Sequence, residues 1–84
     1  MELIDTVDLM TSEYYQERML AEYLQVKIRY EKLVAMLEKY KTGTLPFKPK
    51  CSYDLLKSQA DYMAKYIECL EIRAKIEGVK LDEQ

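Results

Sequence analysis

A chain of 84 residues has room for one small domain, and 49% hydrophobic with 33% charged residues is typical of a folded, helix-rich protein. The net charge of −2 disfavours a duplex nucleic-acid binder. Two cysteines far apart and no histidine argue against a zinc site or a disulfide framework, so we expect no metal, no cofactor and a reducing cytoplasm. No stretch approaches the roughly 20 apolar residues that cross a bilayer, so we expect no membrane contact.

Residues 1–11 alternate apolar and acidic side chains, among them Leu3, Ile4, Asp5 and Val7. The spacing is compatible with one short amphipathic helix or with an arm laid on a neighbour, and the sequence leaves both open.

Two long apolar stripes with alternating spacings of four and three residues follow, and they predict two helices. The first stripe comprises Met19, Tyr23, Val26, Tyr30, Leu33, Leu37 and Tyr40, and the second comprises Leu56, Ala60, Met63, Ile67, Leu70 and Ala74. We expect helices over residues 12–42 and 52–78, a loop over 43–51 and a tail over 79–84. Both prolines lie in that loop.

The expected helix ends follow from single residues. Thr11 or Ser12 offers a side-chain oxygen to cap the first helix, and Ser52 does so for the second. Gly43 and Gly78 are placed to adopt the left-handed conformation that ends a helix.

The resulting fold class is all-α: a single domain over 1–84, built as an antiparallel two-helix hairpin with a short N-terminal helix or arm. Each helix also carries a second apolar stripe. The second stripes comprise Leu20, Leu24, Ile28 and Ala35 on the first helix, and Leu55, Tyr62, Tyr66, Cys69 and Ile76 on the second. Two helices cannot enclose so wide an apolar surface, so we expect homo-oligomerisation to complete the fold.

Charge is segregated along the chain. Residues 39–50 carry four lysines and no acid, whereas residues 1–22 carry six acids and only Arg18. In an antiparallel hairpin the basic loop and the acidic segment, together with Asp82 and Glu83, lie at opposite ends. Two interpretations of this segregation stay open: the charged ends are simply solvated, or the basic end is a tip that binds an anion or docks head to tail.

We expect Leu45 and Phe47 of the loop to fold back and plug the open end of the hairpin.

Eight tyrosines and a few polar residues beside the stripes are the candidate ligand contacts. A tyrosine offers a stacking face and a hydroxyl, although tyrosines on a stripe also serve for packing alone. An arginine at the edge of a seam pairs with a carboxylate or a phosphate, and we expect Gln59 on the inner arc of its helix, where its amide needs a partner. The alternative for each is a hydrogen bond that fixes register. The predicted ligand-binding set is Arg29, Tyr30, Lys32, Gln59, Tyr66 and Arg73.

Catalytic motifs are absent from the sequence. It has no histidine, no nucleophile elbow and no glycine-rich phosphate loop, so we do not expect an enzyme.

The second helix resembles a family of short phage-encoded helical hairpins. The resemblance rests on Leu55-Leu56-Lys57, Gln59, Met63, Tyr66, Leu70 and Arg73, preceded by Arg29, Lys32, Leu33 and Met36-Leu37, and it covers residues 17–77. These hairpins are similar in organisation to the phage anti-CBASS and anti-Thoeris sponges. The resemblance implies an oligomer that sequesters a nucleotide-derived immune messenger in the cytoplasm of an infected bacterium.

The leading hypothesis is therefore a phage anti-defence protein that binds a cyclic oligonucleotide or a cyclic ADP-ribose type of messenger without catalysis. The alternative is a helical interaction module that inhibits or scaffolds a host or phage protein, such as a host defence protein. Nucleic-acid binding through the basic loop is the least favoured possibility, because the chain is acidic overall.

Overall fold

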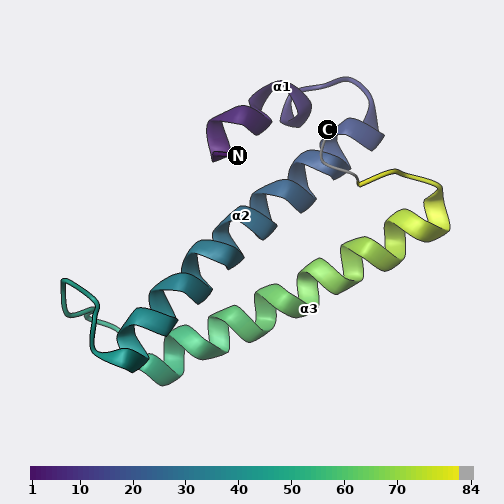
Figure 1. Ribbon diagram of the computed structural model, residues 1–84. Coiled ribbons are helices and arrows are strands. Elements are labelled where there is room, and N and C mark those ends of the chain that lie inside the picture. The colour runs from purple at the N-terminus through teal and green to yellow at the C-terminus, as the bar shows by residue number, and fades with distance from the viewer. Residues whose placement is uncertain (82–84) are drawn as a thin grey trace.

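The computed structural model describes residues 1–81, and they form helices joined by turns and one loop. A 3₁₀ helix, η1 (Leu3–Thr6), runs directly into a one-turn helix, α1 (Val7–Met10), and two long helices follow, α2 (Tyr15–Thr42) and α3 (Tyr53–Glu77). The all-α prediction is confirmed. Figure 1 shows α2 and α3 side by side with opposite directions, and α1 on the other side of α2.

The ends of the long helices have identifiable causes. The hydroxyl of Ser52 accepts a hydrogen bond from the amide of Leu55 at 3.1 Å, which confirms the predicted cap of α3. Gly43 and Gly78 have φ values of 75° and 71°, a region that a side chain disfavours, and both helices end there as predicted.

The start of α2 differs from the prediction. The helix begins at Tyr15, three residues later than expected, and the residue at its N-cap position is Tyr14, which makes no side-chain capping bond. The Ser12 hydroxyl accepts instead from the amide of Tyr14 at 3.1 Å, and the Arg18 guanidinium donates to the Ser12 carbonyl at 2.8 Å. Ser12 therefore stabilises the turn before the helix rather than its first amides.

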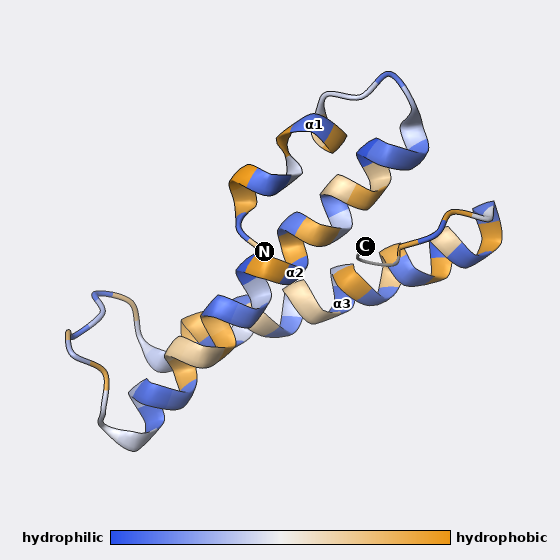
Figure 2. Ribbon diagram, turned by 45° about the horizontal axis from the view of Figure 1, so that its top comes forward, coloured by the Kyte–Doolittle hydropathy of each residue, from blue (hydrophilic) through white to orange (hydrophobic). Residues whose placement is uncertain are grey.

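The core lies between the first half of α2 and the second half of α3. Its buried members are Met19, Tyr23, Leu24, Val26, Leu70 and Ala74, with Leu9, Val79 and Leu81 packed against them. Figure 2 shows that hydrophobic segments recur along both long helices and on the N-terminal helices that lie over α2. At the loop end the two helices meet through the rings of Tyr40 and Tyr53, whose centroids are 5.6 Å apart in an edge-to-face arrangement.

The N-terminal segment docks on α2 through a buried polar contact. Thr6 is fully buried, and its hydroxyl donates to the Leu3 carbonyl at 2.7 Å and accepts from the Gln25 amide at 2.9 Å. Glu2 forms an exposed ion pair with Lys32 at 3.0 Å. Residues 1–11, which the sequence left undecided, are thus two short helical turns laid on the same chain.

This docking corrects the interpretation of the second stripe of α2. We expected that stripe to need a partner molecule, but Leu24 and Ile28 are buried within one chain. Gln25, Ile28 and Lys32 share a helix face, and the contacts of Gln25 and Lys32 with residues 2–6 place the N-terminal segment over it. The first half of α2 is therefore covered on two sides without a second copy.

The second stripe of α3 stays exposed among the described residues. Tyr62 and Ile76 are 76% and 79% exposed, and Leu55 and Cys69 are exposed as well. Gln59 is also exposed, so its predicted place on the inner arc is wrong. The inner arc of α3 is formed by residues such as Ala60, Leu70 and Ala74, which are buried on another side of the helix.

The contact between Thr6 and Gln25 supplies a test of the N-terminal docking. Thr6→Val keeps the side-chain shape but leaves the Gln25 amide without its buried acceptor, which costs about 1 to 3 kcal/mol. We expect amide hydrogen exchange in residues 3–10 to accelerate at least tenfold. The control is Thr11→Val, whose exposed hydroxyl donates to the Val7 carbonyl, and it should leave the exchange rates within about twofold. Equal exchange in the two variants would contradict the docking role of Thr6.

Candidate functional site

A hollow beside the α2–α3 interface contains two of the predicted ligand-binding residues. It has a volume of about 260 Å³ and is lined by Glu22, Gln25, Val26, Arg29 and Tyr66. The four residues from α2 are spaced three, one and three apart, so they lie on one face of that helix. Tyr66 comes from α3, and we name this feature the Arg29–Tyr66 hollow.

The polar side chains of the hollow differ in whether they have hydrogen-bond partners within residues 1–81. The Tyr66 hydroxyl donates to the Glu22 carboxylate, and Gln25 is engaged by Thr6. The Arg29 side chain is exposed and makes no hydrogen bond or ion pair with any residue of 1–81. The hollow thus combines a positioned aromatic ring, a carboxylate and a guanidinium that is available to an anion.

The other predicted site residues lie elsewhere. Lys32 is paired with Glu2, and Tyr30 is half-buried. Gln59 and Arg73 lie on the exposed side of α3, where the Arg73 Nε is 3.4 Å from the Glu77 carboxylate. Of the six predicted residues, the structure brings only Arg29 and Tyr66 together in one hollow.

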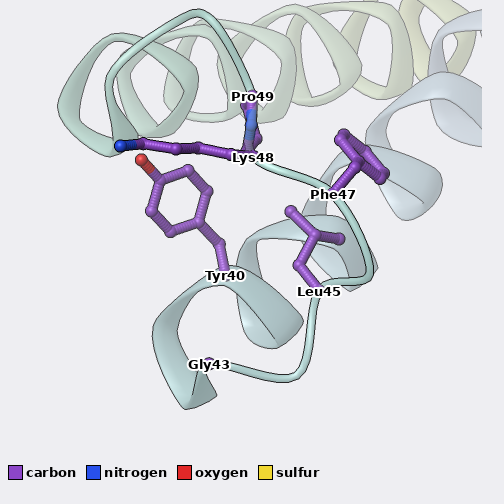
Figure 3. Close-up of a pocket in the computed structure, with 6 residues that line it drawn as sticks. All are labelled: Tyr40, Gly43, Leu45, Phe47, Lys48 and Pro49. Carbon is purple, nitrogen blue, oxygen red and sulfur yellow. The ribbon is translucent and has the colours of Figure 1, made fainter.

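The loop contains a second hollow that the sequence did not predict. It has a volume of about 200 Å³ and is lined by Tyr40, Gly43, Leu45, Phe47, Lys48 and Pro49. Figure 3 shows the Tyr40 ring pointing toward the extended side chain of Lys48, with Leu45 and Phe47 on the other side. Phe47 is 58% exposed, so the prediction that it plugs the hairpin is wrong. The signal available in the sequence was the joint presence of Tyr40, Leu45 and Phe47 among four lysines.

A third hollow lies at the other end of the hairpin, and Tyr23 forms part of its wall. It has a volume of about 410 Å³, and Glu71, Lys75 and Lys80 are among its lining residues. The Tyr23 hydroxyl donates to the Glu71 carboxylate at 3.1 Å, and the Lys27 ammonium lies 5.6 Å from the centroid of the Tyr23 ring. Burial and the hydrogen bond to Glu71 raise the pKa of Tyr23, while the charge of Lys27 opposes the shift.

In residues 1–81, no group of three or more Cys, Asp or Glu side chains is arranged to hold a metal ion. None of the helices described combines the length and apolarity that a membrane span requires. The predicted role of Asp82 and Glu83 falls outside the described residues.

The fold is that of a small helical protein with hollows beside its two long helices. A family model described as Sequestin matches residues 13–76, which is most of the chain. The protein belongs to the Sequestin family, and that name is compatible with the sequestration of a molecule. No curated protein and no solved structure matches the chain.

The raised pKa of Tyr23 predicts a loss of stability at alkaline pH. The folded state favours the neutral phenol, so its contribution is fully present below the unfolded pKa of about 10 and is lost as the pH rises through the higher folded value. We expect the wild type to lose more unfolding free energy between pH 8 and pH 11 than Tyr23→Phe. The matched control is Tyr62→Phe, because Tyr62 is exposed, and it should follow the wild-type slope. A Tyr23→Phe slope equal to both would contradict the assignment.

Proposed function

We propose that the protein is a phage anti-defence factor that binds a nucleotide-derived immune messenger and sequesters it without chemistry. The messenger class is a cyclic oligonucleotide or a cyclic ADP-ribose derivative. The observation that carries the proposal is the Arg29–Tyr66 hollow, where an aromatic ring from α3 lies beside a guanidinium from α2 that pairs with no residue of 1–81. Membership in a family whose name is compatible with sequestration supports it.

The chemistry of the hollow suits the two halves of a nucleotide. Stacking of a base on an aromatic ring is worth about 1 to 3 kcal/mol, and the hydroxyl of Tyr66 is already fixed by Glu22, so the ring is positioned before binding. The Arg29 guanidinium has five N–H donors and pairs with a phosphate in two parallel hydrogen bonds. The Glu22 carboxylate adds an acceptor for ribose hydroxyls.

The size of the hollow bears on how the messenger is held. A volume of about 260 Å³ is small for a cyclic nucleotide, because sites for drug-sized ligands range from about 300 to 1,000 Å³. A single chain therefore accommodates part of the ligand, and a second copy of the chain at the open side would enclose the rest. The proposal accordingly includes a homo-oligomer in the cytoplasm of the infected cell.

Calorimetry with a panel of cyclic dinucleotides, cyclic trinucleotides and cyclic ADP-ribose isomers tests this proposal. We expect one member to bind, and Arg29→Ala to weaken its affinity about 10- to 100-fold, since a hydrogen bond to a charged group is worth about 1.5 to 3 kcal/mol. The matched control is Arg18→Ala, an exposed arginine at the start of α2 that should leave the affinity within about twofold. The absence of heat with every compound at high micromolar concentration would refute the proposal.

The exposed second stripe of α3 favours the alternative function, a module that inhibits or scaffolds a host or phage protein. Leu55, Tyr62 and Ile76 form part of a helix face of the kind that enters an apolar groove. A pull-down from host lysate separates the two functions. Recovery of a stoichiometric polypeptide, with no small molecule released on denaturation, would favour the interaction module over the sponge.

A further inference from the structure

The exposed face of α3 has the spacing of a coiled-coil contact. Starting from Leu55 and ending at Ile76, seven residues follow one another at intervals of four, three, four, three, four and three. All seven are exposed, although four of them are aliphatic or aromatic. An average interval of 3.5 residues keeps side chains in line along a partner helix. We name this row of residues the outer stripe.

The order of residue types in the outer stripe is nearly the same in both directions. Aliphatic residues stand at its ends, Leu55 and Ile76, and long polar residues come next, Gln59 and Arg73. Tyr62 and Cys69 follow, with Tyr66 at the centre. In an antiparallel helix pair with two-fold symmetry, each residue opposes the residue at the mirrored position of the other copy. A stripe that reads nearly alike in both directions therefore places aliphatic residues opposite aliphatic residues and polar residues opposite polar residues.

We propose that α3 packs antiparallel against α3 of a second copy of this chain, with the two Tyr66 residues at the two-fold axis. Leu55 then lies opposite Ile76 of the second copy, and Gln59 lies opposite its Arg73. Tyr62 meets the segment around Cys69. The aliphatic side chains that are exposed in one chain become mutually buried, at both ends of the contact.

The charges of α3 select the antiparallel direction. In a parallel, in-register pair each residue of the outer stripe lies beside its own copy, so Arg73 would meet Arg73, and like charges repel. In the antiparallel pair the Arg73 guanidinium faces the amide oxygen of Gln59, which is an acceptor.

The same arrangement completes the Arg29–Tyr66 hollow. Tyr66 belongs both to the outer stripe and to the wall of the hollow, so two hollows border the two-fold axis. The second copy supplies its own Tyr66 and Tyr62 at the open side of each. The interface stands without any ligand, whereas its role in enclosing a messenger rests on the proposed function.

Disulfide trapping tests the direction of the pair in the purified, ligand-free protein. In a Cys51→Ser, Cys69→Ser background, Tyr66→Cys should form a disulfide-linked dimer under mild oxidation, since it lies on the axis. Leu55→Cys alone should not cross-link, but a mixture of Leu55→Cys and Ile76→Cys chains should. Cross-linking of Leu55→Cys with itself as readily as with Ile76→Cys would overturn the antiparallel arrangement.

Light scattering in solution tests the same interface without introduced cysteines. We expect twice the 10.0 kDa chain mass for the wild type and a fall to the chain mass for Tyr62→Glu, with unchanged helical circular dichroism. The matched control is Ile4→Glu, because Ile4 is 75% exposed and Tyr62 76%, and it should remain a dimer. A monomeric wild type, or the same mass for both variants, would overturn the proposal. Because no messenger is present, failure of the proposed function would leave these results unchanged.

Discussion

The structure depends on covering two apolar faces of the first half of α2. One face packs on α3 through Tyr23, Leu70 and their neighbours, and the other is covered by η1 and α1. A hairpin alone would leave Ile28 in water, at a cost of about 1.5 to 3 kcal/mol. The buried hydrogen bond between Gln25 and the Thr6 hydroxyl, the ion pair of Glu2 with Lys32 and the packing of Leu9 together hold the N-terminal segment on α2.

The long helices were predictable because their apolar spacing and their terminating residues act locally. Ser52 and Gly43 fix helix ends through their own backbone environment, and neither needs the rest of the fold. The docking of residues 3–10 could not be predicted, because two helical turns carry too little periodicity and the contact uses Thr6 and Gln25, residue types that composition assigns to the surface. For the same reason the second stripe of α2 was misread as an interface between molecules.

The candidate site was predictable in part. Arg29 and Tyr66 were identified as residues of the right chemistry at the edge of a stripe, and the register of α2 against α3 brings them to one hollow. Gln59 and Arg73 share the outer stripe with Tyr66, but each lies seven residues from it along α3 and neither lines the hollow, which depends on the register of the two helices. If the outer stripe pairs two chains, α3 uses one side for its own core and another for its partner. A protein that binds a ligand at an interface between two chains needs side chains that are already positioned before binding, and it needs no reactive side chains.

Sequestration of an intact messenger by an oligomer is tested most directly by native mass spectrometry of the protein purified from cells that produce the messenger. We expect an assembly with an even number of chains that carries additional mass, and release of an intact cyclic nucleotide or cyclic ADP-ribose derivative on denaturation. Assemblies without bound small molecules from such cells would contradict sequestration. Release of a cleaved nucleotide would contradict binding without catalysis.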